Sequence, residues 1–157
     1  MELIPMTKRY ALEVVTWRYP KPYGCYDMTT SDIEVLADPD HQFYALLDGD
    51  QLIGYRSFGP DGQVPGGDYD ASALDTGGGL RPDLAGRGLG RTAISNGLDF
   101  GRKLFAPHAF RVTVAAFNAR ALRVVESLGF AETAHFNATT DGRPYRVLVR
   151  AESPHRQ

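Results

Sequence analysis

Apolar and polar residues alternate along this chain at two spacings, and each spacing predicts one kind of secondary structure. Short apolar runs bounded by glycine, proline, aspartate or asparagine predict strands. Apolar residues three and four positions apart predict helices. The strands are expected over residues 3–6, 42–47, 51–58, 73–80, 110–115, 130–137 and 144–150. The helices are expected over residues 7–16, 31–37, 89–105 and 118–128.

Local capping signals mark where these helices begin and end. Thr7 and Asn118 are suited to accept hydrogen bonds from the first-turn N–H groups of their helices. Ser31 and Glu34 have the spacing of a capping box. Gly129 is suited to end the last helix in a left-handed conformation.

The order of the elements predicts the fold class. It runs strand, helix, helix, three strands, helix, strand, helix and two strands, which indicates an α/β fold of the mixed α+β kind. At 157 residues the chain is long enough to bury one substantial core. We expect a single domain over residues 1–152 and a frayed end over residues 153–157.

A glycine-rich stretch at the start of the third helix carries the main chemical signal. Gly86, Gly88 and Gly90 leave the backbone free to turn tightly against a ligand. The helix start presents unpaired N–H groups and the positive end of the helix dipole, both of which favour phosphate. Arg87 and Arg91 add positive charge. The stretch therefore predicts a site for a phosphate-bearing ligand.

Two common nucleotide motifs do not fit this stretch. A P-loop requires Lys followed by Ser or Thr after its last glycine, but Arg91 and Thr92 follow Gly90. A dinucleotide fingerprint requires Gly-x-Gly-x-x-Gly in the first strand–turn–helix unit, with an acidic residue about 20 positions later. The glycines here lie in the middle of the chain, and no such acid occurs near residues 107–111.

The glycine-rich stretch resembles the acyl-CoA pyrophosphate loop of the GNAT superfamily of N-acetyltransferases. The loop of that superfamily reads Arg or Gln, two residues, Gly, one residue, then Gly or Ala, with a proline shortly before. Pro82, Gly88 and Gly90 match this pattern, whereas Ala85 stands at the Arg or Gln position.

Residues 118–130 resemble the second cofactor motif of the same superfamily, in which an asparagine opens a helix that ends in Leu-Gly-Phe. In the family this asparagine, here Asn118, contacts the pantetheine arm. A tyrosine four residues before the glycine often protonates the departing thiolate, and Val125 stands at that position. The sequence of this helix is similar to those in the branch that contains ribosomal-protein alanine acetyltransferases.

The resemblance implies the GNAT fold and acetyl-CoA as cofactor. That fold has a mixed, mostly antiparallel sheet of about seven strands flanked by four helices. Its fourth and fifth strands splay apart, and the acyl-thioester arm lies in the gap. The glycines over residues 77–79 suit close approach by a ligand. The residues expected to bind the cofactor are Leu80, Arg81, Gly86, Arg87, Gly88, Leu89, Gly90, Arg91, Thr92, Asn118, Ala121 and Arg123.

Within this set, the backbone groups of Leu80 and Arg81 are expected to bind the pantetheine and polarise the thioester carbonyl. Arg123 and its neighbour Arg120, in the first turns of the fourth helix, are evenly balanced between contact with the cofactor phosphates and a solvated role.

The family's reaction is direct attack of an amine on the thioester in a ternary complex, so it requires a base, an acid and positioning. Asp75, on the fourth strand, is the candidate base, with a solvated strand-end acid as the alternative. In the base role, Asp75→Asn would lower turnover and leave cofactor affinity unchanged. Tyr145 is the candidate acid, and a core aromatic is the alternative.

The segment between the first two helices is unusually aromatic for a loop. Family members use this region to shape the acceptor site, which makes Trp17, Tyr19, Tyr23 and Tyr26 candidate walls of the acceptor pocket. Packing of these rings over the edge of the core is the equally weighted alternative.

Composition and charge narrow the partners. A net charge of −2 argues against nucleic acid as the main partner. We find neither an apolar run of membrane-spanning length nor a signal-peptide pattern, and expect no membrane contact. The single cysteine, Cys25, can form no internal disulfide and cannot by itself hold a metal, so we expect a reducing, cytoplasmic setting and no metal site.

Two functions follow. The leading one is an acetyl-CoA-dependent N-acetyltransferase acting on a primary amine, either a small molecule or a protein or peptide N-terminus. The other is a CoA-binding or acyl-CoA-binding sensor of the same fold with weak catalysis, motivated by Ala85 and Val125. A monomer and a homodimer are both compatible with the sequence.

Overall fold

The three-dimensional structure is a computed structural model, and it describes residues 1–153. The helices are α1 (Lys8–Val14), α2 (Ile33–Ala37), α3 (Leu89–Phe105) and α4 (Ala119–Ser127). The strands are β1 (Glu2–Pro5), β2 (Phe43–Asp48), β3 (Gln51–Phe58), β4 (Leu74–Leu80), β5 (Ala109–Ala115), β6 (Ala131–Asn137) and β7 (Pro144–Ala151). The element order is the one that the sequence predicts. Of the expected frayed end, residues 154–157 lie outside the described residues.

The strands form one seven-stranded sheet in the order β1-β2-β3-β4-β5-β7-β6. All neighbouring strands are antiparallel except β4 and β5, which are parallel. The predicted mixed, mostly antiparallel sheet with four helices is therefore confirmed.

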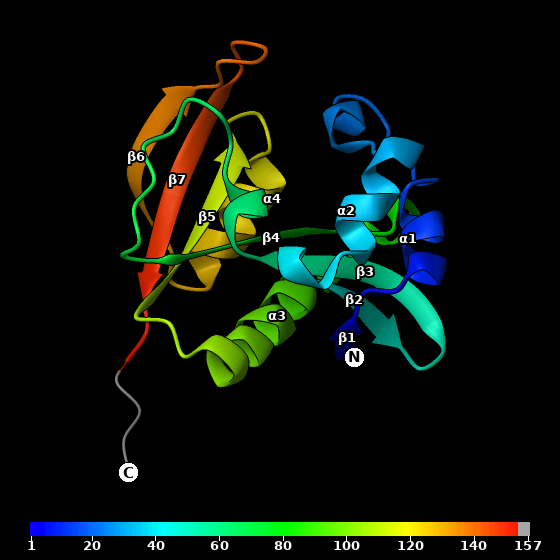
Figure 1. The fold of residues 1–157 in the computed structure, drawn as a ribbon. Helices are drawn as coiled ribbons and strands as arrows, with labels where there is room; N and C mark the ends of the chain where they lie inside the picture. The colour runs from blue at the N-terminus through cyan, green and yellow to red at the C-terminus, as the bar shows by residue number, and fades with distance from the viewer. Residues whose placement is uncertain (154–157) are drawn as a thin grey trace.

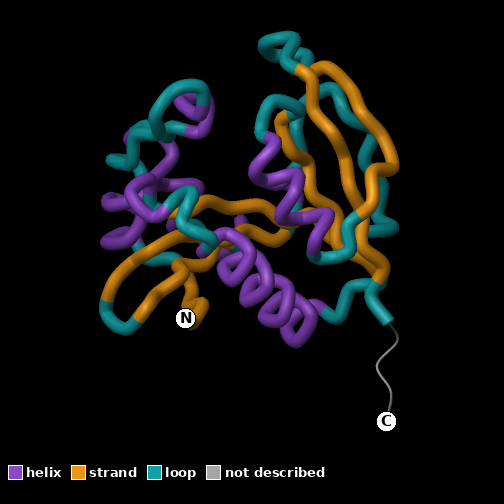
Figure 2. Tube along the Cα trace, turned by 180° about the vertical axis from the view of Figure 1, so that it is seen from behind, coloured by secondary structure: helices purple, strands orange, loops and turns teal. Residues whose placement is uncertain are grey.

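Strands β4 and β5 pair at only two positions. Leu74 lies opposite Phe110 and Asp75 opposite Arg111, after which β4 continues to Leu80 and β5 to Ala115 without further pairing. In Figure 1, β4 crosses the middle of the molecule while β5, β7 and β6 stand upright beside it. Figure 2 shows the same divergence from behind. The predicted splay of the fourth and fifth strands is confirmed.

The helices cover the two faces of the sheet. One core cluster joins α1 and α2 to β2 and β3, with Val14, Leu36 and Ala45 nearly inaccessible to solvent. The other joins α3 and α4 to β3, β5 and β7, around Phe58 and Phe110. Burial of these apolar side chains is the main favourable term that holds the layers together.

The helix caps agree with the sequence signals except at α2. The side chains of Thr7 and Asn118 accept N–H groups of α1 and α4 as predicted. The capping box before α2 uses Thr29 and Asp32, so the prediction of Ser31 and Glu34 is wrong by two positions. A short 3-10 turn over Thr30–Asp32 precedes α2, and the box caps that turn instead.

Candidate functional site

The edge of β4 that faces the splay carries free backbone groups. The Arg81 N–H donates to the Ile53 carbonyl at 2.8 Å, and the Gly59 N–H donates to the Asp75 carbonyl at 2.8 Å. In an antiparallel pair, successive residues direct their N–H and C=O alternately toward the partner and away from it. Gly78 and Leu80 therefore direct their backbone groups toward the gap between β4 and β5.

This arrangement brings Leu80 to the gap and corrects the expectation for Arg81. The Arg81 N–H is used by β3, and its guanidinium is held by the Asp83 carboxylate at 2.7 Å and the Leu52 carbonyl at 3.1 Å. Arg81 thus anchors the strand end instead of facing the gap.

Tyr19 reaches the same point from the aromatic loop. Its hydroxyl donates to the Leu80 carbonyl at 2.6 Å, which leaves the Leu80 N–H as the group free to meet a ligand. Burial raises the pKa of Tyr19 well above its usual range, with the Tyr55 and Asp27 side chains adding to the shift. The Tyr19 hydroxyl therefore stays protonated and acts as a donor at neutral pH.

The glycine-rich loop follows this strand end after a short 3-10 turn over Pro82–Leu84. Gly86 and Gly88 have φ values of 79° and 78°, a conformation that favours glycine. Gly88 is the N-cap of α3 and makes no side-chain cap hydrogen bond, so the first-turn N–H groups of this 17-residue helix are open to a ligand. Leu89, Gly90 and Thr92 lie in the first turns of α3, which begins at Leu89 as predicted.

Arginines from two helices surround the loop. Arg87 is exposed, and Arg91 donates from Nε to the Ser127 hydroxyl at 3.2 Å, which ties α3 to α4. The Arg120 guanidinium lies over the Tyr23 ring, 4.8 Å from its centroid. Its Nη1 is 2.9 Å from the place where a Cβ on Gly86 would lie. Arg123 is exposed on the same helix.

Asn118 joins α4 to the aromatic loop. Its Oδ1 accepts the Ala121 N–H at 3.1 Å, and its Nδ2 donates to the Tyr26 hydroxyl at 3.2 Å. Burial raises the pKa of Tyr26, so its hydroxyl stays protonated at neutral pH. This contact joins two segments that lie 92 residues apart in the chain.

The aromatic loop forms a small cluster with the turn before α4. The Tyr23 and Tyr26 rings lie 5.7 and 6.2 Å from the Phe117 ring, and both tyrosines are half-buried. Trp17 is different. It is only 8% exposed and packs in the core between α1, α2 and the sheet, so the structure does not support its expected place in an acceptor pocket.

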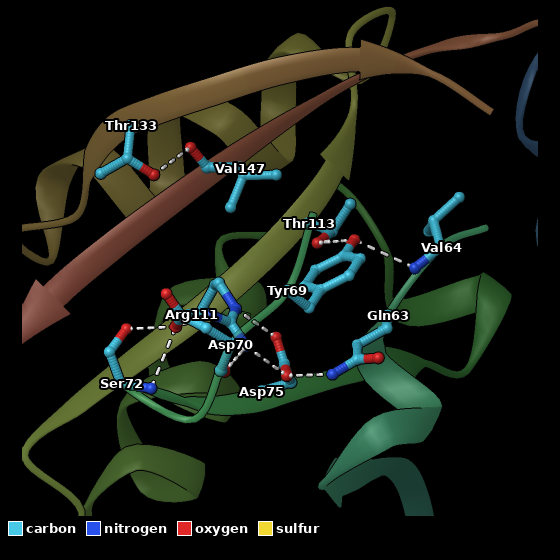
Figure 3. Close-up of polar contacts among 10 residues, drawn as sticks. All are labelled: Gln63, Val64, Tyr69, Asp70, Ser72, Asp75, Arg111, Thr113, Thr133 and Val147. Atoms are coloured by element: carbon cyan, nitrogen blue, oxygen red, sulfur yellow. Dashed lines mark hydrogen bonds and ion pairs between the residues drawn. The ribbon is translucent and has the colours of Figure 1, made fainter. Parts of the chain in front are cut away.

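Asp75 lies in a buried ion pair. Figure 3 shows its carboxylate between the Arg111 guanidinium and the Gln63 amide. Arg111 donates from Nε at 2.7 Å and from Nη2 at 2.8 Å, and Gln63 donates at 2.9 Å. The two charged side chains are 5% and 6% exposed. A carboxylate that accepts three hydrogen bonds, two of them from a cation, is poorly suited to remove a proton.

The position of this pair explains its role. Asp75 and Arg111 are the last paired positions of β4 and β5, so the ion pair holds the two strands together where they begin to diverge. Arg111 also contacts Asp70 and lies over the Tyr69 ring, which attaches the preceding loop. The Asp75 and Asp70 carboxylates raise the pKa of Arg111. From this geometry we infer that Asp75 serves the architecture of the site and not its chemistry.

Tyr145 lies on β7 opposite Ala115, the last residue of β5. Its ring stacks on Phe136, with 5.9 Å between the ring centroids, and it is half-buried. Burial raises the pKa of its hydroxyl, so it remains a protonated group that can donate. Val125, at the position where the family's tyrosine stands, is buried in the core.

Three residues of the site escaped the sequence analysis. Arg111 is the partner of Asp75, Phe117 is the platform for the aromatic loop, and Arg56 is buried behind β4. The position of Phe117 directly before Asn118 was an available signal. Within residues 1–153, no group of three or more His, Cys, Asp or Glu side chains is arranged to hold a metal, and no helix has the length and apolarity to cross a membrane.

Several solved structures share this architecture. A point mutant of the spermidine N-acetyltransferase SpeG from Vibrio cholerae has a TM-score of 0.71 at 18% identity, covering 96% of this chain and 95% of that chain. The aminoglycoside acetyltransferase AAC(6')-Ib in complex with coenzyme A has a TM-score of 0.75 at 17% identity, covering 95% and 93%. An acetyltransferase (GNAT family) from Bacillus anthracis has a TM-score of 0.68 at 14% identity, covering 95% and 93%.

At these identities the structural likeness shows the fold alone. No curated protein matches the chain significantly in sequence. The profile of the acetyltransferase (GNAT) family, in contrast, matches residues 9–130. None of these comparisons specifies the ribosomal-protein alanine acetyltransferase branch. Because the matched segment spans more than half of the chain and includes both cofactor motifs, the protein belongs to the acetyltransferase (GNAT) family.

Proposed function

We propose that this protein transfers an acetyl group from acetyl-CoA to a primary amine, carried by a small molecule or by a protein or peptide N-terminus. The observation that carries the proposal is the gap between β4 and β5, which opens beyond Asp75 and Arg111 and has the glycine-rich loop at its outer end. A ligand with a diphosphate at one end and a narrow thioester arm at the other matches both features.

The residues present fit this ligand. The N–H groups at the start of α3 would hold the diphosphate, with Arg87 and Arg120 nearest to the loop. The thioester arm would lie along β4, where the Leu80 N–H faces the gap and would donate to the carbonyl oxygen. Acetyl-CoA, when bound, supplies an acyl group activated for transfer.

The proton steps involve the tyrosines around the gap. We assign Tyr145 as the donor of a proton to the departing sulfur, because it lies opposite Ala115 at the end of β5 and its hydroxyl is protonated at neutral pH. Asp75 is not assigned as the base, since its carboxylate is held by Arg111 and Gln63. Tyr19, Tyr23 and Tyr26 would line the approach of the amine.

The acceptor is assigned only as a class. Structures with this fold include a spermidine N-acetyltransferase and an aminoglycoside acetyltransferase. The first is named for a polyamine and the second for aminoglycosides. By analogy with these proteins, small molecules with several amines are the first acceptors to test, followed by amino acids and N-terminal peptides.

The direct test is release of CoA thiol from acetyl-CoA in the presence of pools of polyamines, aminoglycosides, amino acids and N-terminal peptides. We expect release that depends on one pool and exceeds one equivalent of enzyme. The exposed Cys25 can itself react with a thiol reagent, so a control without acceptor is subtracted. Acetyl-CoA binding without turnover on any pool would favour the sensor, for which the buried Val125 in place of a tyrosine is the supporting observation.

The placement of the diphosphate makes a separate prediction. Arg87→Ala and Arg120→Ala should each raise the Kd for CoA about tenfold, as expected for loss of one charge-assisted contact to a phosphate. Isothermal titration calorimetry measures the change. Arg146→Ala, on the exposed face of β7, is the control and should bind CoA like the parent. Unchanged affinity in both loop variants would contradict this placement.

A further inference from the structure

Arg56 is a buried cation between β4 and α3, close to the point where β4 and β5 diverge. It lies on β3 opposite Gly78 of β4 and is 6% exposed. It shares the α3 face of the sheet with Tyr44 and Phe58, which belong to the core cluster beneath α3. Long charged side chains are almost never buried in this way without a partner.

No partner of opposite charge accompanies it within residues 1–153. Its one hydrogen bond runs from Nη2 to the Thr76 hydroxyl at 3.4 Å, and its buried Nε has no acceptor. Burial lowers the pKa of Arg56 to about 10, and no carboxylate contributes to that shift. An uncompensated buried charge is costly, so an anion that reached this guanidinium would supply the counter-charge that it lacks.

Two glycines make room for the guanidinium. A Cβ on Gly78 would lie 2.8 Å from Nη1, and a Cβ on Gly97 of α3 would lie 3.0 Å from Nε. The side chain therefore passes between β4 and α3 and ends beside Thr76 and Gly78. These residues follow Asp75, the last position of β4 that pairs with β5, so the cation lies at the closed end of the gap.

The Arg56 guanidinium lies where the acyl group of a bound acyl-CoA would end. The inference rests on the proposed function, in which the diphosphate lies at the start of α3 and the thioester arm passes Leu80. An arm that enters from Leu80 directs its acyl group toward Gly78 and Thr76. A guanidinium there can bind a carboxylate through two parallel N–H groups.

We propose that Arg56 extends the donors of this protein beyond acetyl-CoA to acyl-CoA thioesters whose acyl group ends in a carboxylate, such as malonyl or succinyl thioesters. The amine nitrogen forms a bond to the thioester carbon, the carbon–sulfur bond breaks, and the proton lost by the nitrogen balances the one taken up by the CoA sulfur. The distal carboxylate does not react and stays on the product amide. Arg56 is thus a specificity-determining residue, and acetyl-CoA is a smaller donor that leaves it unpaired.

The test compares donors with the same number of heavy atoms. Isovaleryl-CoA carries two methyl groups where malonyl-CoA carries the two carboxylate oxygens, so the main difference between the two donors is the negative charge. Calorimetric titration of the parent should give a Kd for malonyl-CoA at least tenfold below that for isovaleryl-CoA, as expected for hydrogen bonds between charged groups. Succinyl-CoA and acetyl-CoA are titrated beside them.

Variants then assign the preference to one side chain. Arg56→Met should abolish or reverse the ratio of the two Kd values and leave acetyl-CoA affinity within about threefold, whereas Arg56→Lys should keep part of the ratio. Arg56→Met should also melt at or above the parent temperature, because an apolar side chain of similar volume removes an unpaired charge. Arg146→Gln is the matched exposed control and should leave the ratio unchanged.

Each outcome is decisive. Equal affinity of the parent for malonyl-CoA and isovaleryl-CoA would overturn the role of Arg56, even if no variant folds. A preference that survives in Arg56→Met would do the same. Failure of every CoA thioester to bind the parent would instead refute the proposed function itself.

Discussion

Replacing Asp75 by asparagine should lower the free energy of unfolding by about 3 kcal/mol, because it leaves the buried Arg111 guanidinium without its buried counter-charge. The asparagine amide is nearly the same size, but it would place an N–H donor or a weaker acceptor against the Arg111 guanidinium. The side chains of Asp75 and Arg111 are almost inaccessible to solvent, so water cannot solvate the guanidinium that the substitution leaves behind. Urea denaturation followed by circular dichroism measures the change.

Asp70 provides the matched control for this variant. It also contacts Arg111, at 3.3 Å, but its side chain is 74% exposed. Asp70→Asn should therefore leave the midpoint of urea unfolding close to that of the parent, because solvent screens an exposed ion pair. The base hypothesis predicts instead that Asp75→Asn lowers turnover and leaves cofactor affinity unchanged, and it would be favoured if this loss appeared at normal stability. That result would return Asp75 to the mechanism and refute its architectural role.

Gly78→Ala should both destabilise the protein and weaken acyl-CoA binding. A Cβ on Gly78 would lie far inside van der Waals contact with the Tyr55 carbonyl oxygen, which belongs to the β3 backbone and cannot rotate away. The φ of 152° is also strained for alanine. We expect a loss of about 2–3 kcal/mol, the upper range for overpacking. The clash should also displace the edge of β4 that faces the gap. The backbone groups on this edge would then lose their contacts with the ligand, and the Kd for CoA should rise about tenfold.

Gly77→Ala separates close packing from a general intolerance of alanine on β4. The nearest atom to a Cβ there is the Ser57 hydroxyl oxygen at 3.6 Å, an ordinary contact. This variant should match the parent in stability within about 0.5 kcal/mol, as is usual for substitutions away from special features. Chemical denaturation and CoA titration of both variants test the contrast. Similar losses in the two would show that the clash at Gly78 is not the cause.

Secondary structure was largely predictable because its signals are local. The β3 strand and the α3 helix have the predicted bounds, and Asn118 caps α4 as expected. Alternation, helical spacing and capping each depend on residues within one or two turns of each other. The capping box near α2 shows where local signals are not enough. Both Thr29 and Ser31 are suitable capping residues, and the short 3-10 turn before α2 places Thr29 at the capping position.

The candidate cofactor loop was predictable for the same reason. Its glycines and arginines are contiguous in the chain, and a helix start binds anions whatever its surroundings. The position of Trp17, in the core or in a pocket wall, was not predictable in this way. An aromatic residue in a loop fits a pocket wall and a core equally well, and only the packing of α1 and α2 against the sheet chose the core.

The sequence by itself determined the order of the elements, the family motifs and the position of the phosphate loop, all of which rest on neighbouring residues. Only the tertiary structure decided that Asp75 meets Arg111 and that Tyr26 meets Asn118. It also decided that Arg56 ends beside Gly78 with no counter-charge from the described part of the chain, residues 1–153. These outcomes depend on strand register and on contacts between residues 20 to 92 positions apart. The electrostatic environment of a side chain is a sum over such neighbours, and no local pattern contains it.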